Sequence, residues 1–367
     1  MKFIEQIKSR SNRYSVLKEI SDLKLPVVIY GAGLSGNNIH DYLRQNQISV
    51  IGFTVDKGYG EDTVMSGLPV KLIQHYDETY EGYCVVIAMR NVARAVHNLQ
   101  SHNSSNIKRV YVLCDSPQFI GLVYDYEYVK LYEEAFEEAY SYLADDLSRK
   151  TMLHYVNTII ANKFDLNEAK KLYDPDQYFA KDLIALNDEE VFVDCGAYDG
   201  DMLLSFMTRI REKKCTKYYA LEPDKGNYMG IKKTIDQNHL ANVEVINKGV
   251  WDTGATLKFT GGTTINSCIS STGKVDVEVD SIDNLFYSDN TVTFIKMDVQ
   301  GVELKALNGA VKTIMRDRPK LAICVYHKPE DLFKIPKYIK NLVPEYKLYM
   351  RHHAWSLIET VLYAVIP

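Results

Sequence analysis

Short, uninterrupted apolar runs recur along this chain, separated by segments long enough for a helix, and this alternation limits the fold more than any other feature. In the first part of the chain the runs cover residues 26–30, 49–55, 84–88 and 109–114. Strands that are apolar along their whole length are typical of parallel sheets covered by helices on both faces. The alternation therefore predicts an α/β fold with a doubly wound, Rossmann-like sheet in this part of the chain.

A second series of apolar runs begins at residues 191–193 and predicts a second doubly wound sheet. Its later parallel strands are expected at residues 218–221, 243–246, 293–297 and 321–325. Residues 347–350 and 360–366 follow one another too closely for a full crossover helix. Because strands joined without such a crossover run antiparallel, we expect this pair at the edge of the sheet.

The segment between the two series has the periodicity of a helix. Aromatic and apolar side chains recur there at spacings of three and four, at Tyr128, Tyr132, Phe136, Tyr140, Leu143 and Leu147. This stripe favours a helical connector at residues 118–189 over a partner-binding helix. The predicted organisation is a Rossmann-like domain at 1–117, the connector, and a larger Rossmann-like domain at 190–367, which suits a chain of 367 residues.

Composition excludes several classes of protein. The net charge is −5 and no block rich in Lys and Arg is present, so nucleic acid is not an expected partner. No apolar run approaches the ~18 residues of a membrane span, and the charged N-terminus predicts no secretory signal. Six scattered cysteines without C-x-x-C spacing predict neither disulfides nor zinc. We expect a cytoplasmic protein that acts on a small molecule or glycan, with homo-oligomers left open.

The first strand of the second series leads into a glycine turn of the form D-x-G-x-x-x-G, at residues 194–200. S-adenosylmethionine has no phosphates, so its site needs glycines that let the backbone approach and carboxylates near its ammonium and sulfonium groups. We therefore predict cofactor binding by Asp194, Gly196, Ala197, Tyr198 and Gly200. The alternative interpretation is an ordinary tight turn between a strand and a helix.

The next two strands add further cofactor candidates. Glu222 stands at the tip of the second strand, where an acidic residue can accept both ribose hydroxyls, and Pro223 ends the strand directly after it. Asp224 is expected to cap the following helix. Gly249 and Val250 follow the third strand and are expected to flank the adenine.

Two residues are candidates for the chemistry itself. Asp298 follows the fourth strand, and His327 follows the next one, so both stand at the edge where open α/β sheets bind ligands. His327 is the candidate general base because imidazole titrates near neutrality, although a structural histidine remains an alternative. His352 and His353 are adjacent in a strand and point to opposite faces, so no metal site is expected.

Taken together, these motifs resemble the FkbM family of methyltransferases. The matching segments are QYF (177–179), VFVDCGAYDGD (191–201), ALEPD (220–224), GVWD (249–252), IKMDVQGVELKALNGA (295–310), AICVYHKPEDL (322–332), YKLYMRHH (346–353) and ETVLYAV (359–365). The resemblance covers the chain from about Tyr173 onward and implies a class I methyltransferase fold. It also implies O-methylation with S-adenosylmethionine, commonly of sugar or polyketide hydroxyls and often in surface-polysaccharide biosynthesis.

One departure from that family affects the chemistry. The family commonly reads D-x-E-G where this chain has Gln300 between Asp298 and Gly301. A glutamine side chain is neither a base nor an anionic metal ligand, so Asp298 and His327 carry the prediction.

The first strand of the chain also leads into a glycine turn. Gly31, Gly33 and Gly36 fit G-x-G-x-x-G, and Asp56 follows Gly36 by twenty residues (56 − 36 = 20). This arrangement is typical of a dinucleotide pyrophosphate on a helix N-terminus with an acid on the ribose. Three interpretations stay open here: a nucleotide or nucleotide-sugar, NAD, or a structural domain whose turn binds nothing.

The sequence thus predicts an S-adenosylmethionine-dependent O-methyltransferase that acts on a sugar or nucleotide-sugar hydroxyl. Two alternatives belong to other classes. One is a nicotinamide-dependent oxidoreductase whose first domain does the chemistry, and the other is a non-catalytic assembly protein that binds a nucleotide-sugar.

Overall fold

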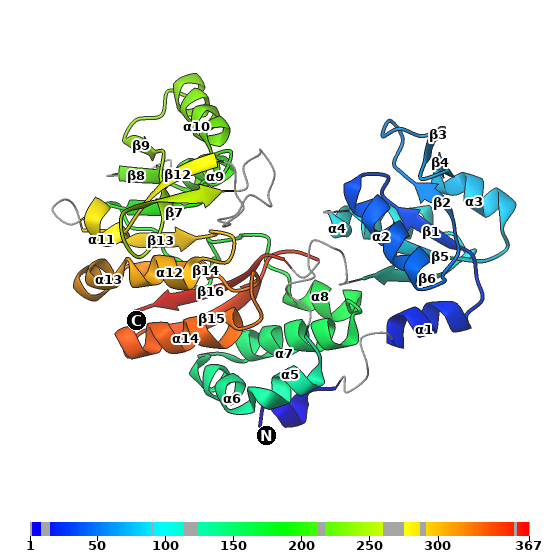
Figure 1. Ribbon diagram of the computed structural model, residues 1–367, viewed down its shortest axis with the longest axis horizontal. Helices are drawn as coiled ribbons and strands as arrows, with labels where there is room; N and C mark the ends of the chain where they lie inside the picture. The colour runs from blue at the N-terminus through cyan, green and yellow to red at the C-terminus, as the bar shows by residue number, and fades with distance from the viewer. Residues whose placement is uncertain are drawn as a thin grey trace. The chain divides into compact units, whose positions relative to one another are not determined.

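The computed structural model describes residues 2–8, 15–89, 91–113, 124–210, 217–259, 275–286, 291–355 and 358–366 (Figure 1). The chain divides into two compact units. The first comprises Met1–Tyr140, Arg149–Pro175 and His352–Thr360, and the second comprises Ser141–Ser148, Asp176–Arg351 and Val361–Pro367. The helices expected to form a connector are therefore divided between the units.

The first unit contains a six-stranded sheet in the order β3-β4-β2-β1-β5-β6. The strands are β1 (Val27–Tyr30), β2 (Val50–Thr54), β3 (Thr63–Met65), β4 (Leu68–Lys71), β5 (Tyr83–Ile87) and β6 (Ile107–Val112). All neighbouring pairs are parallel except β3 and β4, which are antiparallel. The four predicted runs appear as β1, β2, β5 and β6, while Cys114 lies outside the described residues.

Helices of the first unit connect these strands and continue beyond them. They are α1 (Ser15–Asp22), α2 (Leu34–Gln45), α3 (Ile73–Thr79), α4 (Val92–His102), α5 (Tyr126–Leu131), α6 (Glu133–Tyr142), α7 (Asp146–Ala161) and α8 (Leu166–Leu172), with a 3₁₀ turn at Ile4–Gln6. The predicted aromatic stripe is spread over three separate helices. Phe136 is buried while the Tyr132 side chain is 40% exposed, so the stripe does not form one continuous apolar face.

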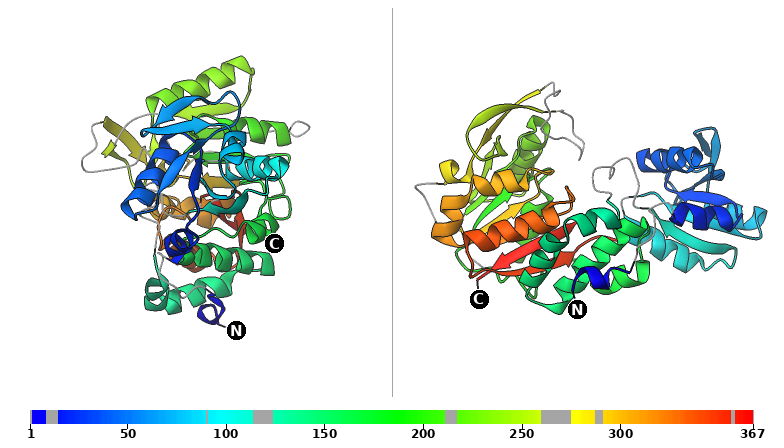
Figure 2. Two further views of the ribbon diagram at one scale, coloured as in Figure 1. Left: turned by 90° about the vertical axis from the view of Figure 1, so that its right-hand side faces the viewer. Right: turned by 60° about the horizontal axis from the view of Figure 1, so that its bottom comes forward.

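The second unit is built on a seven-stranded sheet in the order β15-β16-β14-β13-β7-β8-β9 (Figure 2). The strands are β7 (Val191–Cys195), β8 (Lys217–Leu221), β9 (Val243–Ile246), β13 (Phe294–Met297), β14 (Lys320–Cys324), β15 (Lys347–His352) and β16 (Thr360–Val365). The pairs from β9 to β14 are parallel, and β16 is antiparallel to β14. The predicted α/β fold with parallel sheets is confirmed.

Six helices of the second unit connect these strands. They are α9 (Asp201–Arg209), α10 (Lys225–Gln237), α11 (Ile282–Leu285), α12 (Glu303–Asn308), α13 (Val311–Asp317) and α14 (Asp331–Leu342). The helices α12 and α14 lie side by side (Figure 1). None of the described helices is long and apolar enough to cross a membrane.

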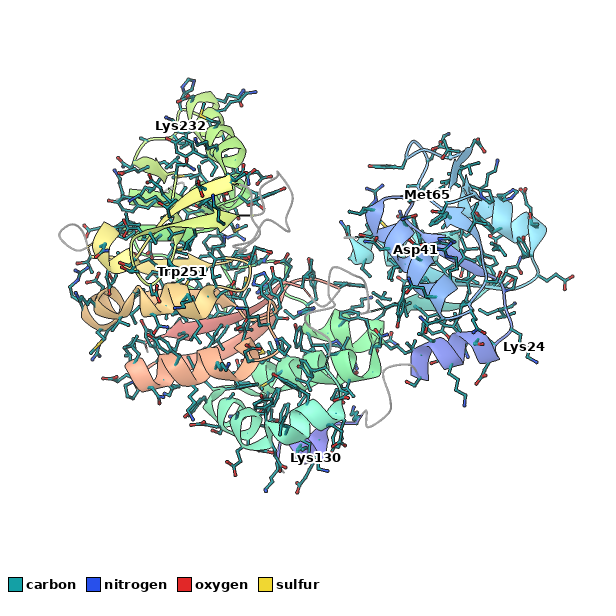
Figure 3. The ribbon with its side chains drawn as sticks, in the orientation of Figure 1. Lys24, Asp41, Met65, Lys130, Lys232 and Trp251 are labelled. Atoms are coloured by element: carbon teal, nitrogen blue, oxygen red, sulfur yellow. The ribbon has the colours of Figure 1, made fainter. Side chains whose placement is uncertain are left out.

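A small second sheet follows β9 and was not predicted. It contains β10 (Gly249–Val250), β11 (Ala255–Phe259) and β12 (Val275–Asp280) in the order β10-β12-β11. Its short core consists of Val277 and Val279, against which Trp251 packs (labelled in Figure 3). The sheet fixes the chain directly after β9, where Gly249 and Val250 stand.

A buried arginine ties the edge of the large sheet to neighbouring segments. The Arg351 side chain is 1% exposed and pairs with Asp145 (2.7 Å) and Asp182 (2.6 Å). It also donates to the Ser148 hydroxyl at 2.9 Å, and Ser148 in turn accepts the backbone N–H of Met350 at 2.8 Å. These contacts explain why the short segment from Ser141 to Ser148 belongs to the second unit.

Candidate active site

The carboxyl ends of the central strands β8, β7, β13 and β14 meet at one edge of the large sheet, where parallel α/β sheets bind ligands. The glycine turn follows β7 and Glu222 follows β8. Asp298 follows β13, and His327 stands three residues after β14. The fold therefore brings the predicted cofactor and acceptor residues to the same edge.

The turn after β7 needs glycine because another part of the chain approaches it closely. Gly196 has φ +80°, and a Cβ atom added there would lie 2.1 Å from the backbone oxygen of Asp298. At Gly200 (φ +85°) the nearest atom to an added Cβ belongs to Ile231, at an ordinary 3.5 Å, so only the backbone conformation favours glycine. Replacing Gly196 would therefore disturb the fold itself, before it tested any contact with a cofactor.

Glu222 links the glycine turn to the end of β8. Its carboxylate accepts the backbone N–H groups of Tyr198 and Asp224, both at 2.9 Å. Burial raises the pKa of Glu222 to about 6, although these hydrogen bonds favour the charged form. Asp224 caps α10 by accepting the N–H of Asn227 at 3.0 Å, as predicted.

Asn247 was not predicted and fixes the end of β9 against the end of β8. Its side-chain amide donates to the backbone oxygens of Glu222 (2.9 Å) and Pro223 (3.1 Å). An added Cβ at Gly249 would lie 3.6 Å from the Pro223 ring, so these two residues are adjacent. The Val250 side chain is buried, which leaves Gly249 as the more accessible of the two residues predicted to flank the adenine.

Asp194 is fully buried and paired with a lysine that the sequence analysis did not assign. Its carboxylate lies 2.9 Å from Lys296 Nζ and accepts the Tyr218 hydroxyl at 2.5 Å. Lys296 also donates to the backbone oxygen of Gly196 at 2.7 Å, so the pair supports the glycine turn. Burial disfavours the charge of Lys296, but Asp194 and Asp298 hold its pKa above the ordinary value. The sequence held one sign of this role, because Lys296 is a single charged residue within the apolar run at residues 293–297.

Asp298 lies among polar side chains from three segments. It accepts the hydroxyl of Tyr178 at 2.8 Å and the Gln300 side-chain amide at 3.2 Å. Burial raises the pKa of Asp298, yet His327, Lys296 and Tyr178 together hold it below its ordinary value. Tyr178 precedes the first strand of this sheet and lies in the QYF segment, which carried no predicted role.

His327 lies between two carboxylates. Its Nδ1 is 2.8 Å from Glu303 Oε1, and its Nε2 is 3.4 Å from Asp298 Oδ1. Glu303 is fully buried at the start of α12 and also accepts the N–H of Val299 at 3.0 Å. Sequence reasoning did not assign Glu303, although it stands in the family-like segment at 295–310.

The surroundings of His327 favour its protonated form. Burial lowers the pKa of His327, but Glu303 and Asp298 outweigh this effect and raise it to about 9. At neutral pH the imidazole of this structure is therefore protonated. A protonated imidazole cannot accept the proton of a hydroxyl group.

A cavity of about 160 Å³ lies beside these loops. It is lined by the start of α12, the start of α14 and the segments before them, with Gly301, Lys305, Lys328, Asp331 and Lys334 among its residues. The lining has mixed charge, because Glu330 and Asp331 also belong to it and Lys305 and Lys334 are paired with Asp252 (2.6 Å) and Glu330 (3.6 Å).

The N-terminal turn has the predicted shape, but its acidic residue is engaged by the chain itself. Asp56, which follows β2, accepts Arg94 Nη2 at 2.6 Å and Asn98 Nδ2 at 2.8 Å. The Tyr30 hydroxyl also donates to it. An added Cβ at Gly36 would lie 2.0 Å from the backbone oxygen of Gly31, and one at Gly31 would lie 2.7 Å from that of Ala88, whereas nothing lies within 4 Å of one at Gly33.

Comparison with known proteins agrees with the resemblance drawn from the sequence. Residues 194–354 match the family described as Methyltransferase FkbM domain. No curated protein is a significant match to the chain.

One solved structure shares the fold over nearly the whole chain, and others are similar to about half of it. The structure of methyltransferase FkbM from Methylobacillus flagellatus KT is 23% identical, has a TM-score of 0.71, and is matched over 98% of this chain and 92% of its own. An S-adenosylmethionine-dependent methyltransferase from Aquifex aeolicus is 18% identical over 56% of this chain and 100% of its own, with a TM-score of 0.33. Aeropyrum pernix fibrillarin, solved with natively bound S-adenosylmethionine, is 14% identical over 50% and 71%, with a TM-score of 0.32.

Proposed function

We propose that residues 194–354, which match the FkbM methyltransferase domain family, form an S-adenosylmethionine-dependent methyltransferase that methylates a hydroxyl group of a sugar or nucleotide-sugar. The observation that carries the proposal is the contact between the two halves of the site. The Gly196 turn, proposed for the cofactor, lies directly against the backbone of Asp298, whose side chain faces His327. Cofactor and acceptor would thus meet at one point of the sheet edge.

The cofactor half of this proposal uses the loops after β7, β8 and β9. Glu222 would accept the ribose hydroxyls with the lone pairs that Tyr198 and Asp224 leave free, and Gly249 would lie against the adenine. The proposed cofactor residues are Asp194, Gly196, Ala197, Tyr198, Gly200, Glu222, Gly249, Val250 and Asp298. Asp194 would support the cofactor site indirectly, through Lys296, because the Asp194 carboxylate is already paired with that lysine.

The reaction is a direct displacement at the methyl carbon. The acceptor oxygen forms the new O–CH₃ bond, the C–S bond breaks, and its electron pair returns to sulfur to give S-adenosylhomocysteine. Catalysis therefore requires alignment of the two molecules and removal of the hydroxyl proton. Asp298 and His327 are the proposed acceptor-side residues, and His327 acts as the base only in the fraction of molecules that has lost its proton.

The cavity next to the site offers one lysine to an acceptor that carries negative charge. Lys305 and Lys334 are paired with Asp252 and Glu330, so Lys328 would be the lysine that binds a phosphate oxygen. A nucleotide-sugar combines such phosphates with sugar hydroxyls, so we propose this class of acceptor, with surface-polysaccharide biosynthesis as its setting. We place the enzyme in the cytoplasm, since the described cysteines Cys84, Cys195 and Cys324 are buried and form no disulfide. The other three, Cys114, Cys215 and Cys268, lie outside the described residues.

Calorimetric titration of the whole chain tests the proposal against its alternatives. S-adenosylmethionine and S-adenosylhomocysteine should bind, each to one site per chain. Binding of NAD without S-adenosylhomocysteine would favour the oxidoreductase, and binding of a UDP-sugar alone would favour the assembly protein. The acceptor is then sought by methyl transfer to nucleotide-sugars.

The N-terminal turn offers one clean variant for the same titrations. Because nothing lies within 4 Å of a Cβ at Gly33, Gly33→Val should fold, unlike changes at Gly31 or Gly36. If this turn and Asp56 bind a nucleotide, nucleotide-sugar or NAD, Gly33→Val should abolish that binding and leave S-adenosylhomocysteine affinity intact. If the intact chain binds none of these ligands at this turn, the domain is structural.

A further inference from the structure

We propose that Asp298, Glu303 and His327 bind a divalent metal cation of the Mn²⁺ or Mg²⁺ type, although the sequence predicted no metal. The proposal that this cation holds the acceptor hydroxyl rests on the proposed function, but the cation site itself does not. Each of the three residues offers one ligand atom, and these atoms all lie within 4.8 Å of one another.

The spacing between Asp298 and His327 fits a shared ion better than a hydrogen bond. Asp298 Oδ1 and His327 Nε2 are 3.4 Å apart, which is longer than the 2.7–3.2 Å typical of N–H···O hydrogen bonds. Two adjacent ligand atoms, each about 2.1 Å from one cation, stand roughly 3.0–3.4 Å apart in octahedral or tetrahedral geometry. An ion between these two atoms would therefore have ordinary bond lengths.

Two buried polar atoms of this group lack a hydrogen-bond partner among the described residues. They are Glu303 Oε2 and His327 Nε2. Glu303 is fully buried, and the His327 side chain is only 10% exposed. Buried polar atoms are normally satisfied, and leaving a charged one unpaired is costly. A cation held by both residues would satisfy these atoms.

The other contacts of the three residues hold them in place as ligands. Glu303 Oε1 lies against His327 Nδ1 at 2.8 Å, which leaves Nε2 turned toward Asp298. Tyr178 donates to the other oxygen of Asp298. Lys296, whose charge also acts on Asp298, is already paired with Asp194.

The ligand set indicates the kind of metal. Two carboxylates favour hard cations, and the single imidazole extends the choice toward Mn²⁺. Three protein ligands leave positions for water and for an acceptor oxygen. A cation at this point lowers the pKa of a bound hydroxyl. His327 is then a ligand and not the base, and the hydroxyl proton leaves to water as the O–CH₃ bond forms and the C–S bond breaks.

The test is Mn²⁺ binding to the full-length protein without cofactor, followed by electron paramagnetic resonance, with Mg²⁺ as competitor. The unmodified protein should bind one Mn²⁺, and Mg²⁺ should displace it. Asp298→Asn, Glu303→Gln and His327→Gln should each weaken Mn²⁺ binding at least about tenfold. Asp331→Asn is the matched control, because it removes a neighbouring buried carboxylate outside the ligand set, and it should change affinity less than about threefold.

Calorimetry with S-adenosylhomocysteine on the same samples separates the two proposals. Glu303→Gln should keep its S-adenosylhomocysteine affinity, which shows that the variant is folded. If the unmodified protein binds S-adenosylhomocysteine but no Mn²⁺ at millimolar concentration, the cation site is wrong and the methyltransferase proposal stands. Mn²⁺ binding that all three substitutions leave unchanged would also overturn the site. Mn²⁺ binding without S-adenosylhomocysteine binding would instead count against the proposed function.

Discussion

The chain contains two glycine turns that start from similar sequence patterns and have different surroundings. Residues 31–36 follow β1, and residues 196–200 follow β7; each turn joins a buried strand to a helix, and each has an acidic residue after the next strand of its sheet. At the first turn Gly36 lies against Gly31 within the turn, and Gly31 lies against Ala88, which follows the neighbouring strand β5. At the second, Gly196 lies against Asp298, which follows a different strand.

The acidic residues of the two turns have different hydrogen-bond partners. Asp56 accepts hydrogen bonds from the side chains of Tyr30, Arg94 and Asn98, including a guanidinium charge. Glu222 accepts backbone N–H groups and forms no ion pair with a cationic side chain among the described residues. A ribose at Asp56 would have to displace side chains, whereas at Glu222 it would add to contacts that already fix the carboxylate. Similar spacing in sequence therefore does not make two turns equal as binding sites.

The largest expected effect is on stability. Gly196→Ala and Gly36→Ala would each place a Cβ within about 2 Å of a backbone oxygen, and we expect each to cost at least about 2–3 kcal/mol. Gly196 also has a positive φ, so its variant should be the worse of the two. Thermal unfolding should shift by at least roughly 4–8 °C.

Gly33→Ala is the control for these two variants. Its Cβ would meet nothing within 4 Å, so its cost should stay below about 1 kcal/mol. If Gly196→Ala were as stable as Gly33→Ala, the close approach to Asp298 would not exist in solution, and the contact that carries the proposed function would be lost.

The second prediction tests the groups beside the C-terminal turn. His327→Ala should lower methyl-transfer turnover by about 10²-fold or more with S-adenosylhomocysteine affinity nearly intact, because a base or a bound cation contributes to the chemical step. Asp298→Ala should reduce both turnover and affinity, since Asp298 adjoins the cofactor turn. Single-turnover methyl transfer measures the first quantity and calorimetry the second. Wild-type turnover in His327→Ala would make the histidine structural.

The sequence predicted the parts of this site that depend on local pattern. The strand ends, the two glycine turns, Glu222 and the Asp224 cap follow from apolar runs, glycine spacing and capping preference. The strands β3 and β4 escaped because they are short and their side chains are largely exposed or partly exposed, so they lack a continuous apolar run.

The missed residues are those whose role depends on the register of distant strands. Lys296 pairs with Asp194 because β13 and β7 align these two positions side by side. Glu303 reaches His327 only because α12 begins beside the loop after β14. Such contacts arise from tertiary packing between segments far apart in the chain, and spacing along a single sequence does not reveal them.

The third prediction compares the two acidic residues directly. Glu222→Ala should weaken S-adenosylhomocysteine binding at least about tenfold, because a hydrogen bond to a charged group contributes roughly 1.5–3 kcal/mol. Asp56→Ala should leave this affinity unchanged, since Asp56 belongs to the other unit. Calorimetric titration of both variants with S-adenosylhomocysteine measures the two dissociation constants. An unchanged dissociation constant for Glu222→Ala would remove Glu222 from the ribose site and erase the contrast between the two turns.

The smallest expected effect is on pH dependence, and it uses the raised pKa of Glu222. Without cofactor this carboxyl titrates at about pH 6, because burial disfavours its charge. The raised pKa stabilises the fold below the ordinary pKa of a glutamate, and this contribution disappears as the pH rises through 6. Ribose hydroxyls donate to the charged carboxylate, so ligand affinity depends on pH in the opposite direction to stability. Affinity is full above pH 6 and falls as the pH drops through 6. Between pH 7.5 and 5 we expect S-adenosylhomocysteine affinity to fall by about five- to tenfold.

Glu222→Gln is the control. It should bind S-adenosylhomocysteine more weakly at pH 7.5, but its affinity should not fall further on acidification. This variant distinguishes the titration of Glu222 from that of every other group in this pH range, including groups of the ligand. If both proteins lose affinity equally on acidification, the titrating group is not Glu222, and its carboxylate does not bind the ribose.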